Sequence, residues 1–140
     1  MCSSDLATNA SIGVHTAAQD STPMVLFVGD VASDQRDREA FQEVDYRAFF
    51  GAFGMAKRVE RIDSAERLPE YVARAFATAL NGRPGPVVLA LPEDMLTQAV
   101  PDDLKPLPRW APPAYQPDPQ GMQRLRELLL KAKQPLVIAG

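Results

Sequence analysis

Two continuous apolar runs, Met24–Val28 and Val87–Leu91, stand out against a chain that otherwise mixes apolar and polar positions. Unbroken runs of this length are typical of strands buried on both faces of a parallel sheet. A third run, Met55–Ile62, combines charged and apolar residues and predicts a strand near an edge of the sheet. The pattern therefore predicts an α/β fold around parallel strands.

The segments between these runs predict helices. Small residues dominate Ala7–Gln19, which suits a helix packed closely against a sheet, and Tyr46–Phe53 predicts a short helix or turn. A longer helix should begin near Pro69 and end at Gly82. Its expected buried stripe consists of Leu68, Val72, Phe76 and Leu80 at intervals of four, joined by Ala75 and Ala79.

Strand–helix–strand order implies a right-handed crossover and a parallel, Rossmann-like sheet. Three strands are fewer than the roughly five or six of a typical sheet, so we expect the sheet to be incomplete and an N-terminal portion to be missing. Residues 1–6 follow no periodic pattern and are left as an unmatched N-terminal stretch that is assigned to no domain. The first domain is expected to span residues 7–95.

Prolines gather after the second apolar run, and residues 96–118 read as an extended linker that Trp110 and Tyr115 pin to a domain surface. Residues 119–140 predict the start of a second α/β domain: a helix capped by Asp118, and then a strand over Gln134–Gly140. The expected buried stripe of that helix is Met122, Leu125, Leu129 and Ala132.

Composition narrows the function classes. The net charge of -3 and the pI near 5.1 provide no basic stripe for nucleic acid, and no apolar run approaches the roughly 20 residues that span a bilayer. A cytoplasmic protein is expected. The single cysteine, Cys2, has no partner for an internal disulfide, and His15 lacks neighbours at metal-ligand spacing, so neither receives a role and no metal ligand is assigned.

The loop Gly29–Asp45 carries the candidate chemistry. It leaves the carboxyl end of the first strand, which is the edge where open α/β sheets bind ligands. It is rich in charged residues, which need partners if they are buried. Spacing alone favours a structural reading in which Phe41 belongs to the core and Gln42 caps a helix.

Six motifs in a fixed order change that reading. They are Ala7-Thr8-Asn9, Asp20-Ser21-Thr22-Pro23, Gly29-Asp30-Val31, Ala40-Phe41-Gln42-Glu43-Val44-Asp45, Gly82-Arg83-Pro84-Gly85-Pro86-Val87 and Leu91-Pro92-Glu93-Asp94. Together they resemble the second half of the pyrimidine-binding domain of thiamine pyrophosphate-dependent enzymes, most closely the acetolactate synthase catalytic subunit, and residues 122–140 resemble the start of its central domain. Many synthases of this type have Gly-Gln-Val where this chain has Gly29-Asp30-Val31.

The resemblance implies an enzyme that condenses or decarboxylates 2-keto acids, as in branched-chain amino acid biosynthesis, with the chemistry supplied by the cofactor. By the same resemblance, Val31 and Phe41 line the substrate pocket, and Gln42 serves the cofactor or its intermediate as a catalytic residue. Thr8 and Asn9 lie at the start of a helix on the cofactor side. The family's catalytic glutamate is expected in the missing segment, and the pyrophosphate-binding domain is also expected outside this chain, so this chain alone is expected to be inactive.

The family also implies a homodimer or homotetramer with active sites between subunits, and Mg²⁺ held by ligands outside this chain. FAD in the central domain is a further candidate cofactor. Two alternatives remain open at this point: a sister decarboxylase or lyase of the benzoylformate decarboxylase or glyoxylate carboligase type, and a degenerate α/β domain without catalysis.

Overall fold

The structure, a computed structural model, describes residues 4–108 and 110–138. The α-helices of the described residues are α1 (Ser4–Asn9), α2 (Ser11–Gln19), α3 (Tyr46–Gly51), α4 (Leu68–Leu80) and α5 (Pro119–Lys131). Its strands are β1 (Met24–Asp30), β2 (Arg58–Arg61) and β3 (Pro86–Pro92). All three strands fall on the runs that predicted them, and the α/β class is confirmed. None of the described helices is long and apolar enough to cross a membrane.

The described strands form one three-stranded sheet in the order β1-β3-β2, and both pairings are parallel. The last strand in the chain is therefore the central one. The charged strand β2 lies at an edge, as predicted. Strand β3 is buried along most of its length, but Phe27 of β1 is 46% exposed, so the prediction that β1 is buried on both faces is wrong for this edge strand.

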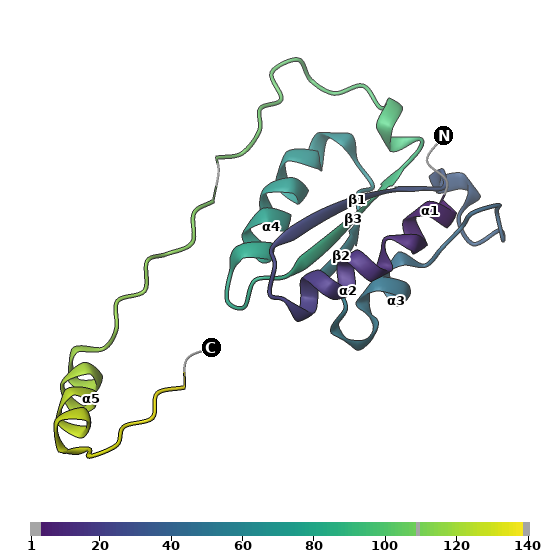
Figure 1. Cartoon of the computed structure of the whole chain (residues 1–140). Helices are drawn as coiled ribbons and strands as arrows, with labels where there is room; N and C mark the ends of the chain where they lie inside the picture. Colours follow the sequence, from purple (N-terminus) through teal and green to yellow (C-terminus); the bar gives the residue numbers. More distant parts are fainter. Residues whose placement is uncertain (1–3, 109, 139–140) are drawn as a thin grey trace.

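Helices cover both faces of the sheet, with α4 on one side and α1, α2 and α3 on the other (Figure 1). Strand β3 alternates between the two cores: Val87 and Leu89 belong to the cluster with α4, while Val88 and Ala90 belong to the cluster with α2 and α3. This period of two is what a central strand between two helical layers requires.

The buried face of α4 differs from the predicted stripe. Ala75 and Ala79 are buried as predicted, and Leu68 and Val72 pack half-buried against the same core. Phe76 is 51% exposed, so the expectation that it belongs to the buried stripe is wrong. The C-cap of the helix is Asn81, one residue before the predicted cap at Gly82. Gly82 follows with a φ of 63°, a left-handed conformation that costs a glycine little.

The predicted helix over Ala7–Gln19 is two helices. The chain turns at Ala10, whose N–H donates to the carbonyl oxygen of Ala7 at 3.1 Å, and α2 begins one residue later. Thr8 and Asn9 therefore lie in the last turn of α1, and the expectation that they begin a helix is wrong.

In the C-terminal segment, the predicted N-cap of the helix is confirmed, but its predicted buried stripe is wrong. The Asp118 carboxylate accepts a hydrogen bond from the N–H of Gly121 at 2.7 Å, as predicted for the N-cap of α5. All four predicted stripe residues, Met122, Leu125, Leu129 and Ala132, are exposed in this chain. No strand forms over residues 134–138, so the predicted terminal strand is wrong there; Ala139 and Gly140 lie outside the described residues.

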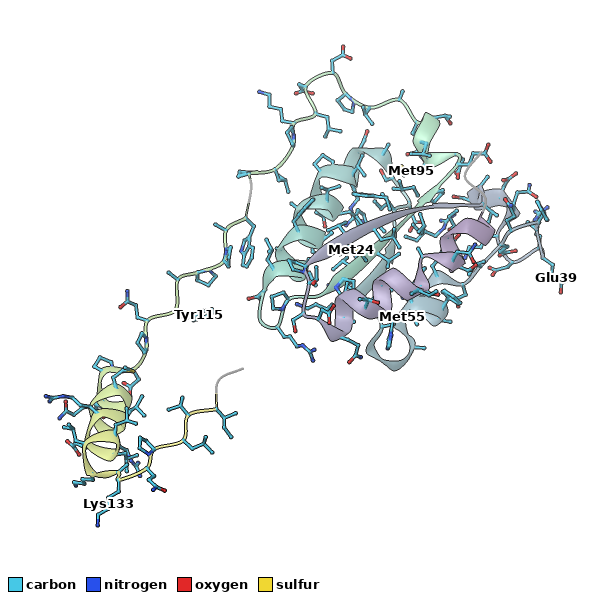
Figure 2. The ribbon with its side chains drawn as sticks, in the orientation of Figure 1. Met24, Glu39, Met55, Met95, Tyr115 and Lys133 are labelled. Atoms are coloured by element: carbon cyan, nitrogen blue, oxygen red, sulfur yellow. The ribbon has the colours of Figure 1, made fainter. Side chains whose placement is uncertain are left out.

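The prediction that Tyr115 attaches the linker to a domain surface is wrong. Its side chain is 80% exposed on the extended segment between the sheet and α5 (Figure 2). Trp110 is half-buried.

Candidate functional site

The loop 31–45 begins where β1 ends, at the carboxyl edge of the sheet, as the sequence predicts. Asp30 lies opposite Pro92, so the loop and the segment after β3 start side by side. The N–H of Glu93 joins them by donating to the carbonyl oxygen of Asp30 at 3.2 Å. These two segments enclose a hollow of about 560 Å³, called the loop hollow below. It is lined by Gly29, Asp30, Val31, Ala32, Gln35, Ala40, Phe41, Gln42, Leu91, Glu93 and Leu96.

Three of the predicted site residues, Val31, Phe41 and Gln42, meet in the loop hollow. Phe41 is 85% exposed, which excludes the reading of Phe41 as a core residue. The helix after the loop is capped by Asp45, whose carboxylate accepts from the N–H of Ala48 at 2.9 Å, so Gln42 is not its cap. The side-chain amide of Gln42 forms no hydrogen bond with the described part of the chain and is available to a ligand.

The backbone of the loop is held in an unusual conformation. Asp37, Glu39 and Gln42 have φ values of 62°, 55° and 70°, in the left-handed region that costs a residue with a Cβ roughly 1–2 kcal/mol. Such conformations persist only where surrounding contacts fix them, and they gather at ligand sites. Figure 2 shows Glu39 at the outer tip of this loop.

Two carboxylates hold the backbone of the loop: Glu43 belongs to the loop itself, and Asp94 lies outside it, after β3. The Glu43 side chain accepts from the N–H groups of Asp37 at 2.6 Å and Ala40 at 3.2 Å. These backbone hydrogen bonds, with Asp37 first, outweigh desolvation and lower the pKa of Glu43. Asp94, beyond β3, accepts from both the N–H and the hydroxyl of Ser33, which lowers the pKa of Asp94.

Arg61 connects the loop to β2, the outer strand on the other side of β3. Nε of Arg61, the last residue of β2, donates to Oδ2 of Asp30 at 2.7 Å, and its Nη1 donates to Oδ1 of Asp63 at 2.5 Å. The other oxygen of Asp30 accepts from the N–H of Val31 at 2.9 Å. Burial acts to lower the pKa of Arg61, but the two carboxylates outweigh it and the pKa is raised. Arg61 therefore remains a cation.

The other two predicted site residues lie elsewhere. Thr8 and Asn9 are not among the described residues that line the loop hollow, and Asn9 is exposed at the end of α1.

The chemistry of the loop hollow fits an organic ring and not a diphosphate. Its walls are apolar side chains with one free amide, and its charged members, Asp30 and Glu93, are both acidic. No lysine or arginine is among the described residues that line it. The described residues also contain no group of three or more His, Cys, Asp or Glu side chains placed to hold a metal ion.

Sequence reasoning missed Arg61, Glu43 and Asp94 as residues that shape the site. The signal for Arg61 and Asp94 was their position: both lie at or just past the end of a predicted strand, and in a parallel sheet those ends share one edge. Glu43 gave no such signal, because its partners are backbone N–H groups of its own loop.

Comparison with known proteins gives concordant results. Residues 6–49 match the family described as thiamine pyrophosphate enzyme, N-terminal TPP binding domain. The chain is 35% identical over 146 residues to the acetolactate synthase large subunit of Buchnera aphidicola subsp. Acyrthosiphon pisum (strain APS), covering 96% of this chain and 24% of that protein. It is 29% identical to the glyoxylate carboligase of Escherichia coli O157:H7, covering 95% of this chain and 22% of that protein.

A solved structure agrees with these matches. The benzoylformate decarboxylase from Polynucleobacter necessarius superimposes with a TM-score of 0.77 and 26% identity, over 91% of this chain and 24% of that one. The chain thus spans about a quarter of the length of its relatives. The resemblance drawn from the six motifs is confirmed: residues 6–49 match the thiamine pyrophosphate enzyme N-terminal domain, and 96% of the chain is similar to acetolactate synthase large subunits.

Proposed function

We propose that this chain is part of an enzyme that uses thiamine pyrophosphate to condense or decarboxylate 2-keto acids, as acetolactate synthases do in branched-chain amino acid biosynthesis. The observation that carries the proposal is the loop hollow. It brings Val31, Phe41 and Gln42 together at the carboxyl edge of a parallel sheet, and all three lie within the segment that matches the cofactor-binding family.

Each residue has a proposed role. When bound, thiamine pyrophosphate supplies a nucleophilic carbon and an electron sink. Val31 and Phe41 provide an apolar wall that excludes water from the reacting 2-keto acid. The free amide of Gln42 donates to the oxygen on which negative charge develops. Thr8 and Asn9 are proposed to serve the cofactor side.

The remaining features of the proposal concern the complete enzyme. Mg²⁺ would join the diphosphate, held by residues outside this chain, and FAD is a further candidate cofactor. The enzyme would be a cytoplasmic homodimer or homotetramer. Residues 96–118 would act as a linker and 119–140 as the start of a central domain. Residues 1–140 alone would be inactive and would bind thiamine pyrophosphate weakly, because the loop hollow offers no cation to a diphosphate.

The test is a product assay on the complete enzyme, purified without cofactor. Pyruvate is added with thiamine pyrophosphate and Mg²⁺, with either one omitted as a control, and acetolactate is quantified. The proposal expects acetolactate only when both are present. Failure to convert pyruvate or any other 2-keto acid under these conditions would overturn it.

A sister lyase is the second candidate, supported by the structural match to a benzoylformate decarboxylase and the sequence match to a glyoxylate carboligase. The same preparation is therefore assayed with benzoylformate and with glyoxylate. A higher kcat/KM for either substrate than for pyruvate would favour the sister activity. Inactivity on all three, together with no binding of thiamine pyrophosphate by calorimetry, would favour a non-catalytic domain.

A further inference from the structure

Arg61 spans the sheet at its carboxyl edge. It is the last residue of β2, whereas its partner Asp30 is the last residue of β1, and the two strands lie on opposite sides of β3. The guanidinium therefore reaches past the end of the central strand. Besides Asp30, it meets Ser33 Oγ at 3.2 Å and the carbonyl oxygen of Val31 at 3.4 Å. One side chain thus contacts the last residue of β1 and two residues at the beginning of the loop.

The ion pair between Arg61 and Asp30 matters for the loop hollow because Asp30 lines it. Asp30 and Val31 line both the loop hollow and a second, polar hollow of about 370 Å³ on the Arg61 side. The Asp30 side chain is only 8% exposed, so water screens its charge poorly. Arg61 neutralises that charge at 2.7 Å, and the second carboxylate oxygen holds the N–H of Val31.

We infer that Arg61 is a positioning residue for the loop hollow, which fixes the start of the loop at Val31 and screens the Asp30 carboxylate from an anionic ligand. This inference rests on the proposed function, because a 2-keto acid carries a carboxylate that a bare Asp30 would repel. The two parts are separable: neutralisation needs only a positive charge, whereas fixing the loop needs a guanidinium that meets several acceptors at once.

Four variants of the complete enzyme test both parts. Arg61→Gln removes the positive charge. Arg61→Lys keeps the charge but loses the guanidinium that meets several acceptors at once. The double variant, Arg61→Gln with Asp30→Asn, removes the charges of both partners. The control is Arg58→Gln on the same strand. Arg58 pairs with Glu60 at 2.6 Å, is not among the residues lining either hollow, and leaves Glu60 paired with Arg74.

Steady-state kinetics with a 2-keto acid measure the charge effect. Arg61→Gln should raise KM about tenfold with a smaller change in kcat, as an uncompensated buried charge near an anion would. Arg61→Lys and the double variant should return KM to within about twofold of the parent value, since neither leaves Asp30 as a bare carboxylate. Arg58→Gln should match the parent.

Hydrogen exchange of the enzyme without cofactor measures the positioning effect. Amides of residues 31–35 should exchange faster in Arg61→Gln, Arg61→Lys and the double variant, while amides of β3 remain at the parent rate. This readout needs no turnover, so it reports on Arg61 even if the parent enzyme converts no 2-keto acid, a result that would overturn only the proposed function.

Three outcomes would overturn the inference about Arg61 itself. One is an active parent with unchanged KM in Arg61→Gln. Another is a double variant whose KM stays as high as that of the single variant, which would assign the effect to general disruption. The third is parent-like exchange of residues 31–35 in all the Arg61 variants. If Arg61→Gln fails to fold, the exchange of residues 31–35 in the lysine and double variants still decides the third outcome, and parent-like exchange in both would overturn the inference.

Discussion

The two edges of the sheet use charged side chains in opposite ways. At the amino edge, Nζ of Lys57 donates to the carbonyl oxygens of Thr78 and Asn81 at 2.6 Å and of Arg83 at 2.9 Å. Arg83 in turn donates to the carbonyl oxygens of Ala18 and Gln19. These cations meet the C-terminal ends of α4 and α2, where helix carbonyls lack internal partners and the helix dipole is negative.

At the carboxyl edge, carboxylates receive the hydrogen bonds instead. Asp30, Glu43 and Asp94 accept from backbone N–H groups of the loop, and three loop residues remain in the left-handed region. The amino edge therefore stabilises regular helices, whereas the carboxyl edge holds irregular backbone in one conformation. Contacts at the first edge should affect folding, and contacts at the second should affect the site.

The largest effect is expected at Gln42. In the complete enzyme, Gln42→Ala should lower kcat on the order of a hundredfold, because loss of one donor to a developing charge costs about 3 kcal/mol. Gln42→Glu should be worse, since a carboxylate repels that charge. Steady-state kinetics at saturating thiamine pyrophosphate and Mg²⁺ measure both.

The matched control for Gln42→Ala is Gln42→Gly. Both remove the amide, but only glycine adopts the observed φ of 70° without strain. Equal kinetic losses in the two variants would assign the effect to the amide. A parent-like kcat in Gln42→Ala would return Gln42 to a structural role.

Lys57→Met should lower stability with no effect on the site. Three carbonyls in the last turn of α4 and just beyond it lose their cationic donor, which predicts a loss of about 1 kcal/mol in the free energy of unfolding. Denaturant titration measures it, with the exposed Lys105→Met as the control. A change in KM for a 2-keto acid in Lys57→Met would break the division between the two edges.

Glu39→Gly should raise stability slightly. Glycine relieves the left-handed strain at φ 55° and loses more chain entropy on folding, so a net gain of about 0.5 kcal/mol is expected. Asp34→Gly, in the same loop but outside its left-handed positions, should instead lose stability. Equal effects of the two substitutions in denaturant titrations would contradict the strain at Glu39.

The smallest effect concerns pH. The pKa of Glu43 is lower in the folded chain than its ordinary value of 4.5, so ionised Glu43 stabilises the loop above that pH. This contribution should disappear as the pH falls through the lowered pKa. NMR shifts of the Asp37 and Ala40 amides should report the transition in the parent and remain flat in Glu43→Gln. A transition that persists in Glu43→Gln would belong to another group.

Local patterns predicted the strands and the loop because each signal lies within a few residues. An apolar run such as Val87–Leu91 requires burial on both sides, and turn residues bound it. The buried face of α4 was predicted less well, because apolar residues occupy more than one side of that helix. Packing against β3 decides between them, and the small residues Ala75 and Ala79 are the ones buried there, while the larger Phe76 remains exposed.

The rest depends on contacts that no local pattern contains. The stripe of α5 specifies a face but not what covers it, and its residues Leu125 and Leu129 are exposed here. The contacts from Arg61 to Asp30 and from Ser33 to Asp94 join residues 31 and 61 positions apart. They follow from the strand register, which had to be known before these pairs could be identified.

The order β1-β3-β2 also has a consequence for synthesis on the ribosome. Both β1 and β2 pair with β3, which is translated last of the three. Neither outer strand can form these ladders until residues 86–92 have left the exit tunnel. Until then the apolar residues of β1 have no partner strand. Ser33 gains its hydrogen-bond acceptor only after Asp94 has also emerged. The nascent chain therefore completes the carboxyl edge of its sheet after the sheet itself.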